Sequence, residues 1–126
     1  MDARELIERY NAGERDFVSA CLVRADLSGA VLTEANLSEV NLNEADLSGA
    51  DLRRACLDKA HLDGADLAGA NLEGTFLYGA YLSGANLAGA NLEGAHLYGA
   101  DLSGATMPDG TVDGGSHSHG DMSEQE

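Results

Sequence analysis

Basic residues, cysteines and long apolar runs are all scarce in this sequence. Seven Lys and Arg stand against 22 Asp and Glu, which gives a net charge of −15. A surface this acidic repels the phosphates of nucleic acids and anionic lipids, so we expect no direct nucleic-acid partner and no membrane partner. The acids can also serve only to keep the protein soluble. Met1 is followed by charged residues, and no apolar run is long enough to cross a membrane, so we expect a cytoplasmic protein.

Leucine recurs at every fifth residue from Leu22 to Leu102, seventeen times without a gap. Alanine stands two residues before each Leu, except where Val40 and Thr75 replace it. A helix would spread residues five apart around its circumference, and a flat strand would point them to alternating sides. The period instead predicts that each five-residue unit forms a short extended side followed by a turn, with every Leu and Ala facing a shared interior.

The remaining positions of the unit favour turns. The residue before Leu is mostly Asp or Asn, and Gly stands two residues after Leu in eleven units. Asp, Asn, Ser and Gly are typical of tight turns, and Gly permits a positive φ. The pattern Ala-(Asp/Asn)-Leu-x-x, as in residues 45–49 and 65–69, resembles the pentapeptide repeat family over about two thirds of the chain. Residues 6–17 resemble the leader of many bacterial, notably cyanobacterial, members.

The resemblance implies an all-β fold, a right-handed quadrilateral β-helix with four units per coil and a short N-terminal capping α-helix. Residues twenty apart would then stack. One inward column of the core would consist of Leu22, Leu42, Leu62, Leu82 and Leu102. Cys21 and Cys56 would lie on different faces beyond disulfide reach, which indicates free thiols in a reducing compartment.

We expect three segments. Residues 1–14 would form the capping helix, starting at Asp2 and Glu5, because the first coil of a solenoid needs cover. The helix would lay these side chains on the open first coil: Leu6, Ile7 and Tyr10. Residues 15–112 would form the β-helix, beginning with Phe17 in the Leu register.

We expect the C-terminal end of the β-helix to be followed by a segment without regular structure. Met107 and Val112 keep the Leu register, so a last partial turn is predicted to end near Val112. Residues 113–126 would be a disordered acidic tail. It contains His117 and His119, two ligands where a metal site needs more, so we expect no metal.

Outward positions carry the information about function, since the inward ones are committed to packing. On a four-unit coil, aromatic side chains of two adjacent coils converge, with His61 near the same corner. This candidate interaction patch consists of Phe76, Tyr78, Tyr81, His96 and Tyr98. Exposed aromatic clusters mark interaction surfaces. The alternative is a cross-strand aromatic ladder that only stiffens the coils.

Two groups of charged residues can be explained without a binding partner. Arg53, Arg54 and Lys59 lie beside the patch, where nearby acids offer local charge balance. Asp26, Asp46 and Asp66 would stack as a ladder of like charges, which backbone N–H groups at the turns can offset. Cation binding is the alternative for that ladder.

The sequence predicts no enzyme. It has no catalytic Ser-His-Asp or Cys-His arrangement in a plausible pocket and no Gly-rich phosphate loop, so we expect no catalytic residue and no cofactor. We expect a non-catalytic protein-protein interaction or scaffold module with an unknown partner, as a monomer or an end-to-end homodimer. The family resemblance implies an alternative, a DNA-mimicking inhibitor or protector of DNA gyrase. A purely structural spacer is a third possibility.

Overall fold

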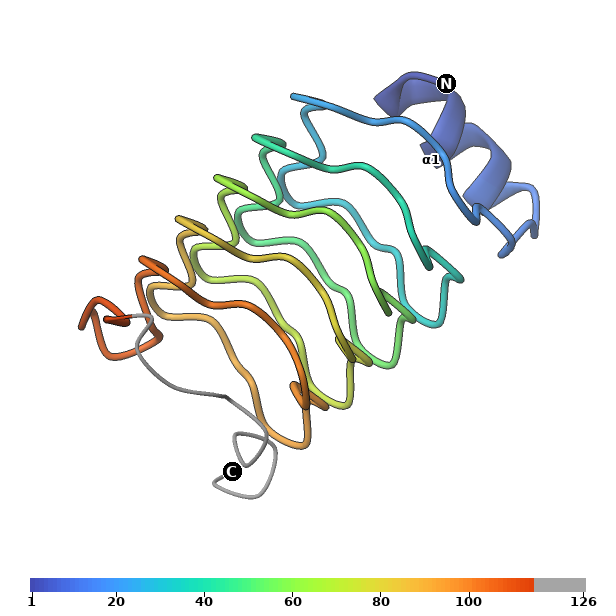
Figure 1. Ribbon diagram of the computed structural model, residues 1–126. Coiled ribbons are helices and arrows are strands. Elements are labelled where there is room, and N and C mark those ends of the chain that lie inside the picture. The colour runs from blue at the N-terminus through green and yellow to red at the C-terminus, as the bar shows by residue number, and fades with distance from the viewer. Residues whose placement is uncertain (115–126) are drawn as a thin grey trace.

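The chain winds into coils stacked along one axis, with a helix at the N-terminal end (Figure 1). The computed structural model describes residues 1–114. Parallel bridges join residues twenty apart, as in Cys21 to Asn41 and Asn41 to His61. Each coil therefore contains four five-residue sides, the number that the family resemblance implies.

Each side ends in a turn that the five-residue unit specifies. In one such turn the N–H of Ala45 donates to the carbonyl of Leu42 at 3.0 Å. Of the two residues between them, Glu44 has a left-handed φ of 61°. Neighbouring coils are joined by main-chain bonds such as Leu42 N–H to His61 O at 2.7 Å.

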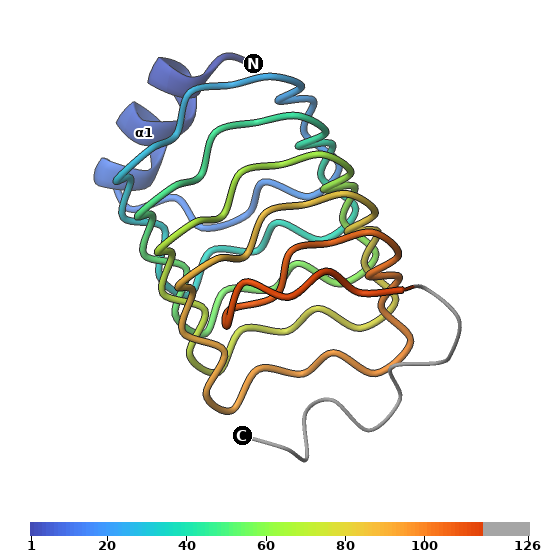
Figure 2. The same cartoon turned by 90° about the vertical axis from the view of Figure 1, so that its left-hand side faces the viewer.

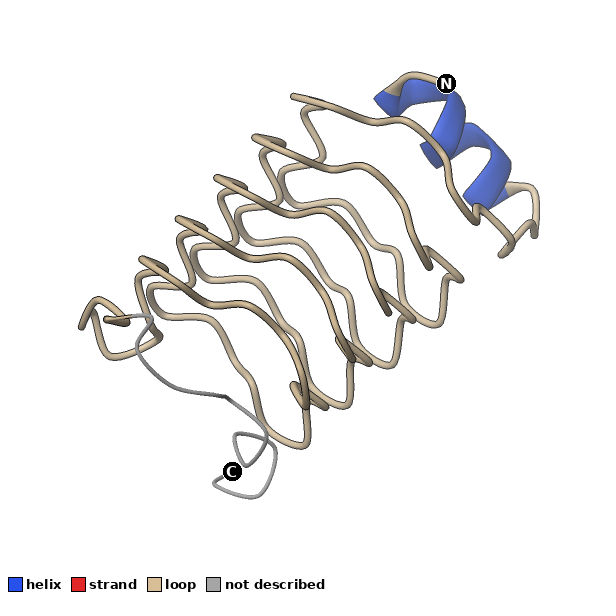
Figure 3. Ribbon diagram, viewed as in Figure 1, coloured by secondary structure: helices blue, strands red, loops and turns tan. Residues whose placement is uncertain are grey.

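Extended strands are absent from residues 1–114, where pairing is limited to isolated bridges (Figure 3). The all-β expectation therefore needs correction at this level. A turn every five residues leaves one bridged residue per side, which is too short for a regular strand. The solenoid is held by many single bridges instead of by long ladders.

The interior is a stack of leucines and alanines. Its first column is at most 2% exposed and consists of Leu22, Leu42, Leu62, Leu82 and Leu102. Burying one Leu contributes about 1.5–3 kcal/mol, so stacked coils accumulate a substantial core from small units. Thr75, in an Ala position, is buried and its hydroxyl donates to the Leu52 carbonyl at 2.6 Å.

Helix α1 (Ala3–Asn11) lies over the first coil, as Figure 2 shows. The Asp2 carboxylate accepts the Glu5 N–H at 2.8 Å and starts the helix. Leu6 is fully buried, and the Tyr10 hydroxyl donates to the Thr33 carbonyl at 2.8 Å. Phe17 is buried in the Leu register. The cap closes the apolar end of the first coil.

The C-terminal end differs from the expected last partial turn. Val112 does not occupy an inward Leu position, since it is 66% exposed. The chain reverses after Met107 and pairs Thr106 with Val112 in an antiparallel bridge. Pro108 cannot donate a main-chain hydrogen bond and Gly110 has a φ of 89°, which favours a reversal over another side. The expectations for the tail, including His117 and His119, lie outside the described residues.

Both cysteines are free thiols, with Cys21 exposed and Cys56 half-buried beside Ser38 at 3.0 Å. Over residues 1–114, no helix has both the length and the apolar character to span a membrane.

Candidate functional site

Two aromatic stacks lie on neighbouring faces of the coils. Phe76 and His96, bridged twenty residues apart, stack with ring centroids 4.6 Å apart and planes 6° from parallel. His61 and Tyr81 stack in the same way at 4.9 Å and 6°. Both pairs have the geometry of a cross-strand ladder, which holds the rings face to face along the solenoid.

Tyr78 joins the first stack. Its ring is tilted at 6.4 Å from Phe76 and 5.5 Å from His96. Its hydroxyl lies 3.1 Å from Nδ1 of His96, within hydrogen-bond distance. The structure therefore brings Phe76, Tyr78 and His96 into one contacting cluster.

The other two predicted residues stand apart from that cluster. Tyr81 stacks on His61 of the preceding coil, on the neighbouring face. Tyr98 makes none of the ring contacts found among residues 1–114. Tyr98 is nonetheless the most exposed ring of the set at 64%, against 41% for Tyr78. Its ring is thus available to a partner rather than used in packing.

Glycine turns separate the two stacks. Gly79 and Gly99 follow Tyr78 and Tyr98, with φ of 65° and 78°. Neither glycine has a side chain, although the Lys59 side chain lies against Gly79, its Cγ 3.6 Å from where a Cβ would stand. We call this region the aromatic corner: Phe76, Tyr78, Gly79, Tyr81, His96, Tyr98 and Gly99. Within the described chain, the carbonyl oxygens of Gly79 and Gly99 accept no hydrogen bond. Unused carbonyl oxygens recur at this position in the other coils, as at Glu44 and Lys59, so these acceptors belong to the turn and not to glycine.

Charge around the aromatic corner is largely of one sign. Asp58 and Asp63 each accept a main-chain N–H from the next coil, from Tyr78 and Ser83, both at 3.0 Å. Exposed Asp101 is bridged to Tyr81. No Lys or Arg occurs after Lys59. The corner is therefore an aromatic surface bordered by carboxylates.

The basic residues nearest this surface are largely balanced. Arg53 makes a two-pronged contact with Asp51 at 2.9 and 2.8 Å, and that guanidinium hydrogen bond lowers the pKa of the Asp51 carboxyl. Arg54 pairs with Glu34 at 3.2 Å. These contacts fit the local charge balance that the sequence suggests.

The acidic ladder is held by its own turns. Asp26, Asp46 and Asp66 each accept the N–H two residues further on, at 3.0–3.1 Å. The Ser48 hydroxyl also donates to Asp46 at 2.6 Å, and with the Ser48 N–H it lowers the pKa of that carboxyl. Across residues 1–114, no three His, Cys, Asp or Glu side chains are grouped to hold a metal. The ladder is explained by turn chemistry.

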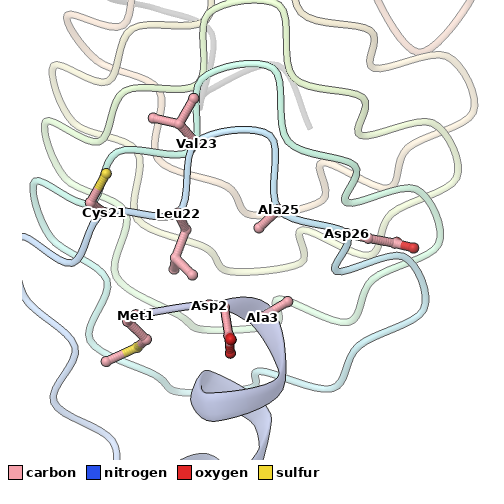
Figure 4. Close-up of a pocket in the computed structure, with 8 residues that line it drawn as sticks. All are labelled: Met1, Asp2, Ala3, Cys21, Leu22, Val23, Ala25 and Asp26. Atoms are coloured by element: carbon pink, nitrogen blue, oxygen red, sulfur yellow. The ribbon is translucent and has the colours of Figure 1, made fainter.

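A pocket of about 560 Å³ lies between the start of α1 and the first coil (Figure 4). In Figure 4, Leu22 points toward α1, and Cys21 and Val23 lie along the coil above it. Its two carboxylates have structural partners, since Asp2 caps α1 and Asp26 accepts from Ser28. The pocket is thus a gap beneath the cap in which both carboxylates serve the fold, and the exposed Cys21 thiol also lines it.

The geometry defines a β-helix solenoid built from five-residue units. A family model described as "Pentapeptide repeats" matches in eight copies, over residues 20–58, 45–84 and 77–109. The chain belongs to the pentapeptide repeat family. Its similarity to solved pentapeptide repeat proteins implies a right-handed β-helix.

Two solved structures resemble it over most of its length. HetL, a pentapeptide repeat protein involved in heterocyst differentiation regulation in the cyanobacterium Nostoc sp. strain PCC 7120, is 36% identical with a TM-score of 0.82. That match covers 83% of this chain and 44% of HetL. AT2G44920, from the Arabidopsis thaliana thylakoid lumen, is 33% identical with a TM-score of 0.72, over 75% of this chain and 66% of the other. The chain therefore spans less than two thirds of either relative.

Two further comparisons add no functional argument. The fluoroquinolone resistance protein QnrB1 is 18% identical with a TM-score of only 0.40. A search of curated proteins by sequence finds no match.

Proposed function

We propose that this chain is a non-catalytic protein-interaction or scaffold module that binds its partner through the aromatic corner. One observation supports this most: ring faces stay exposed on a backbone that needs none of them for its core. The interior is filled by Leu and Ala, whereas Tyr78, Tyr81 and Tyr98 are 41%, 44% and 64% exposed. Aromatic residues are enriched at protein interfaces because they bury large rigid areas.

The rigid backbone strengthens this proposal. Each coil is bonded to the next through main-chain bonds such as Tyr81 N–H to Ala60 O at 2.9 Å. The rings therefore sit on a pre-ordered platform, and binding needs little further loss of conformational entropy.

The test is capture of a partner from lysate of the native organism with wild-type protein and with a Tyr78→Ser, Tyr98→Ser double variant. We expect the double variant to lose the captured protein while keeping its fold. A Val23→Ser, Val31→Ser variant is the matched control, because it removes exposed apolar side chains away from the corner. Lower stability with unchanged capture would show that the rings are only a structural ladder.

A second candidate is DNA mimicry on gyrase. The net charge of −15 on a solenoid without Lys or Arg after Lys59 favours it, since such a surface suits a site that otherwise takes duplex DNA. A gyrase supercoiling assay at micromolar protein should then show inhibition or protection from drugs. An unchanged supercoiling rate would remove this candidate.

The last coil supports an end-to-end homodimer. From Leu22 to Leu87, every Leu N–H of the repeat donates to the next coil. The N–H groups of Leu92, Leu97 and Leu102 donate no hydrogen bond within residues 1–114. Such an open edge can pair with a second copy. Light scattering on the full chain and on a chain ending at Gly114 tests this, and a monomeric mass for both would exclude the dimer.

A further inference from the structure

We propose that the aromatic corner binds an arginine-bearing, cationic segment of its protein partner. This inference rests on the proposed function, in which the corner is the binding surface, and adds the chemistry of the occupant. Three independent features of the corner point to a guanidinium: open ring faces, unused carbonyl oxygens and surrounding carboxylates.

The ring faces fit the first requirement. A guanidinium is planar, weakly hydrated and stacks on aromatic rings. The chain already uses this contact at its other end, where the Arg15 guanidinium lies 3.7 Å above the Tyr10 ring centre and Arg9 lies 5.4 Å from that of Phe17. No such cation covers Tyr78 or Tyr98 in the described part of the chain.

The glycine turns fit the second requirement. A guanidinium carries five N–H donors and satisfies them best against fixed acceptors. The carbonyl oxygens of Gly79 and Gly99, like those at the same position of the other coils, accept no hydrogen bond in residues 1–114. The Lys59 side chain lies against Gly79, where a Cβ would stand 3.6 Å from the Lys59 Cγ, whereas a Cβ at Gly99 would meet only the main chain of Gly79. A stacked guanidinium at the corner can donate to these oxygens while its face remains on a tyrosine ring.

Charge fits the third requirement. Asp58 lies one coil before Tyr78 and accepts its N–H. On the next face, Asp63 lies one coil before Ser83 and accepts its N–H in the same way. Lys59 is the one cation at the border, one coil before Gly79, and no Lys or Arg follows it. The corner therefore attracts cations and repels acidic or phosphate-bearing segments.

The experiment uses the full chain and three synthetic peptides of equal length, (Gly-Arg)₄, (Gly-Lys)₄ and (Gly-Glu)₄. Calorimetry measures affinity, and NMR follows the ring resonances of the corner. We expect the Arg peptide to bind most tightly and to shift the Tyr78 and Tyr98 rings, the Lys peptide to bind more weakly, and the Glu peptide not to bind. Equal affinity for the Arg and Lys peptides, with no ring shifts, would mean diffuse charge attraction and would overturn the proposal.

Variants locate the interaction. Tyr98→Ser should weaken the Arg peptide about two- to fivefold, the usual contribution of an exposed cation–π contact. Asp58→Asn should weaken it about twofold while its oxygen still accepts the Tyr78 N–H. Asp26→Asn makes the same change of charge far from the corner and should leave affinity unchanged. Lys59→Gly should strengthen binding, because it removes the bordering cation.

The inference and the proposed function can fail separately. If native capture depends on Tyr78 and Tyr98 but the Arg peptide does not bind, the corner is a binding surface for a partner of other chemistry, and this inference is wrong. If Asp26→Asn weakens the Arg peptide as much as Asp58→Asn does, binding is not at the corner and the inference is equally wrong.

Discussion

The coils before and after residue 60 share one backbone and one core but differ at their corners. Before it, seven residues other than Gly adopt left-handed φ of 58–63° at the end of a side: Ser19, Arg24, Glu34, Glu39, Glu44, Arg54 and Lys59. After it, nine successive corners from Gly64 to Gly104 are all glycine. A residue with a Cβ adopts this conformation at a cost of about 1 kcal/mol. The repeat thus imposes the turn whichever residue stands there.

The ion pairs made by the charged corner residues of the first region offset little of that conformational cost. Arg24 pairs with Glu44 at 3.1 Å and Arg54 with Glu34 at 3.2 Å, each across one coil. These side chains are more than half exposed, so each pair contributes at most about 1 kcal/mol. The comparison teaches that stability is set by the common core, while the two surfaces are free to diverge: one charged and crowded, the other bare, acidic and aromatic.

The largest test of that conclusion is a pair of core truncations. Leu42→Ala and Leu82→Ala remove equivalent side chains, each 1% exposed, from the two regions. Each should lower the free energy of unfolding by about 3 kcal/mol, the sum of lost burial and an unfilled cavity. Urea unfolding followed by circular dichroism measures both. Values differing by much more than about 1 kcal/mol would mean that the regions do not share one equivalent core.

A corner substitution in the second region should have the next largest effect. In Gly84→Ala the added Cβ meets no atom within 4 Å, so the penalty comes from the φ of 70° alone. We expect a loss of about 1 kcal/mol in unfolding free energy. Ser83→Ala, at the exposed neighbouring position, is the control and should change little. An unchanged stability for Gly84→Ala would show that these corners tolerate side chains freely.

The reverse change in the first region should be smaller. Lys59→Gly relieves a left-handed φ of 58° but adds flexibility to the unfolded chain. The two effects oppose, so we expect a gain of about 0.5 kcal/mol by thermal or urea unfolding. A clear loss of stability would indicate that the Lys59 side chain makes a contribution to packing that its position does not suggest.

The smallest expected effect concerns pH at the acidic ladder of Asp26, Asp46 and Asp66, which Asn86 continues in the next coil. Hydrogen bonds from the Ser48 hydroxyl and N–H lower the pKa of Asp46 below its ordinary value. This carboxylate therefore stabilises the fold above the unfolded-state pKa, and the contribution is lost as pH falls through the folded-state pKa. Asp46→Asn keeps an acceptor without a titrating proton.

The measurement compares urea midpoints of wild type and Asp46→Asn at pH 7 and pH 3. The variant should lose less stability between the two values than the wild type does. An identical pH dependence for wild type and Asp46→Asn would contradict the assignment.

Much of the fold could be predicted because a period of five admits few backbones. The buried Phe17 and the turn-bound aspartates follow from which residues recur at which place. The twenty-residue stacking follows from the four units per coil that the family resemblance implies. The reversal after Met107 could not be predicted from the sequence. The Leu register favours one more side with Val112 buried, whereas Pro108 and Gly110 favour a reversal that leaves Val112 exposed.

The aromatic corner was only partly predictable. Spacing by twenty correctly pairs Phe76 with His96, because bridged residues stack. The same spacing pairs Tyr81 with His61. It does not show that Tyr78 leans onto the first stack or that Tyr98 stays clear of both. Those differences arise from side-chain rotamers and from exposure at the end of the stack, which a one-dimensional register does not contain.

The bonding of each coil only to its neighbours has a mechanical consequence. When the two ends of such a chain are pulled apart, no contact spans the whole rod, so load concentrates on whichever outermost turn is attached to the moving end. The rod should then peel in increments of one winding. Each increment frees twenty residues, about 70 Å of extended chain. Optical-tweezer traces should show a sawtooth at that interval in place of one large rupture.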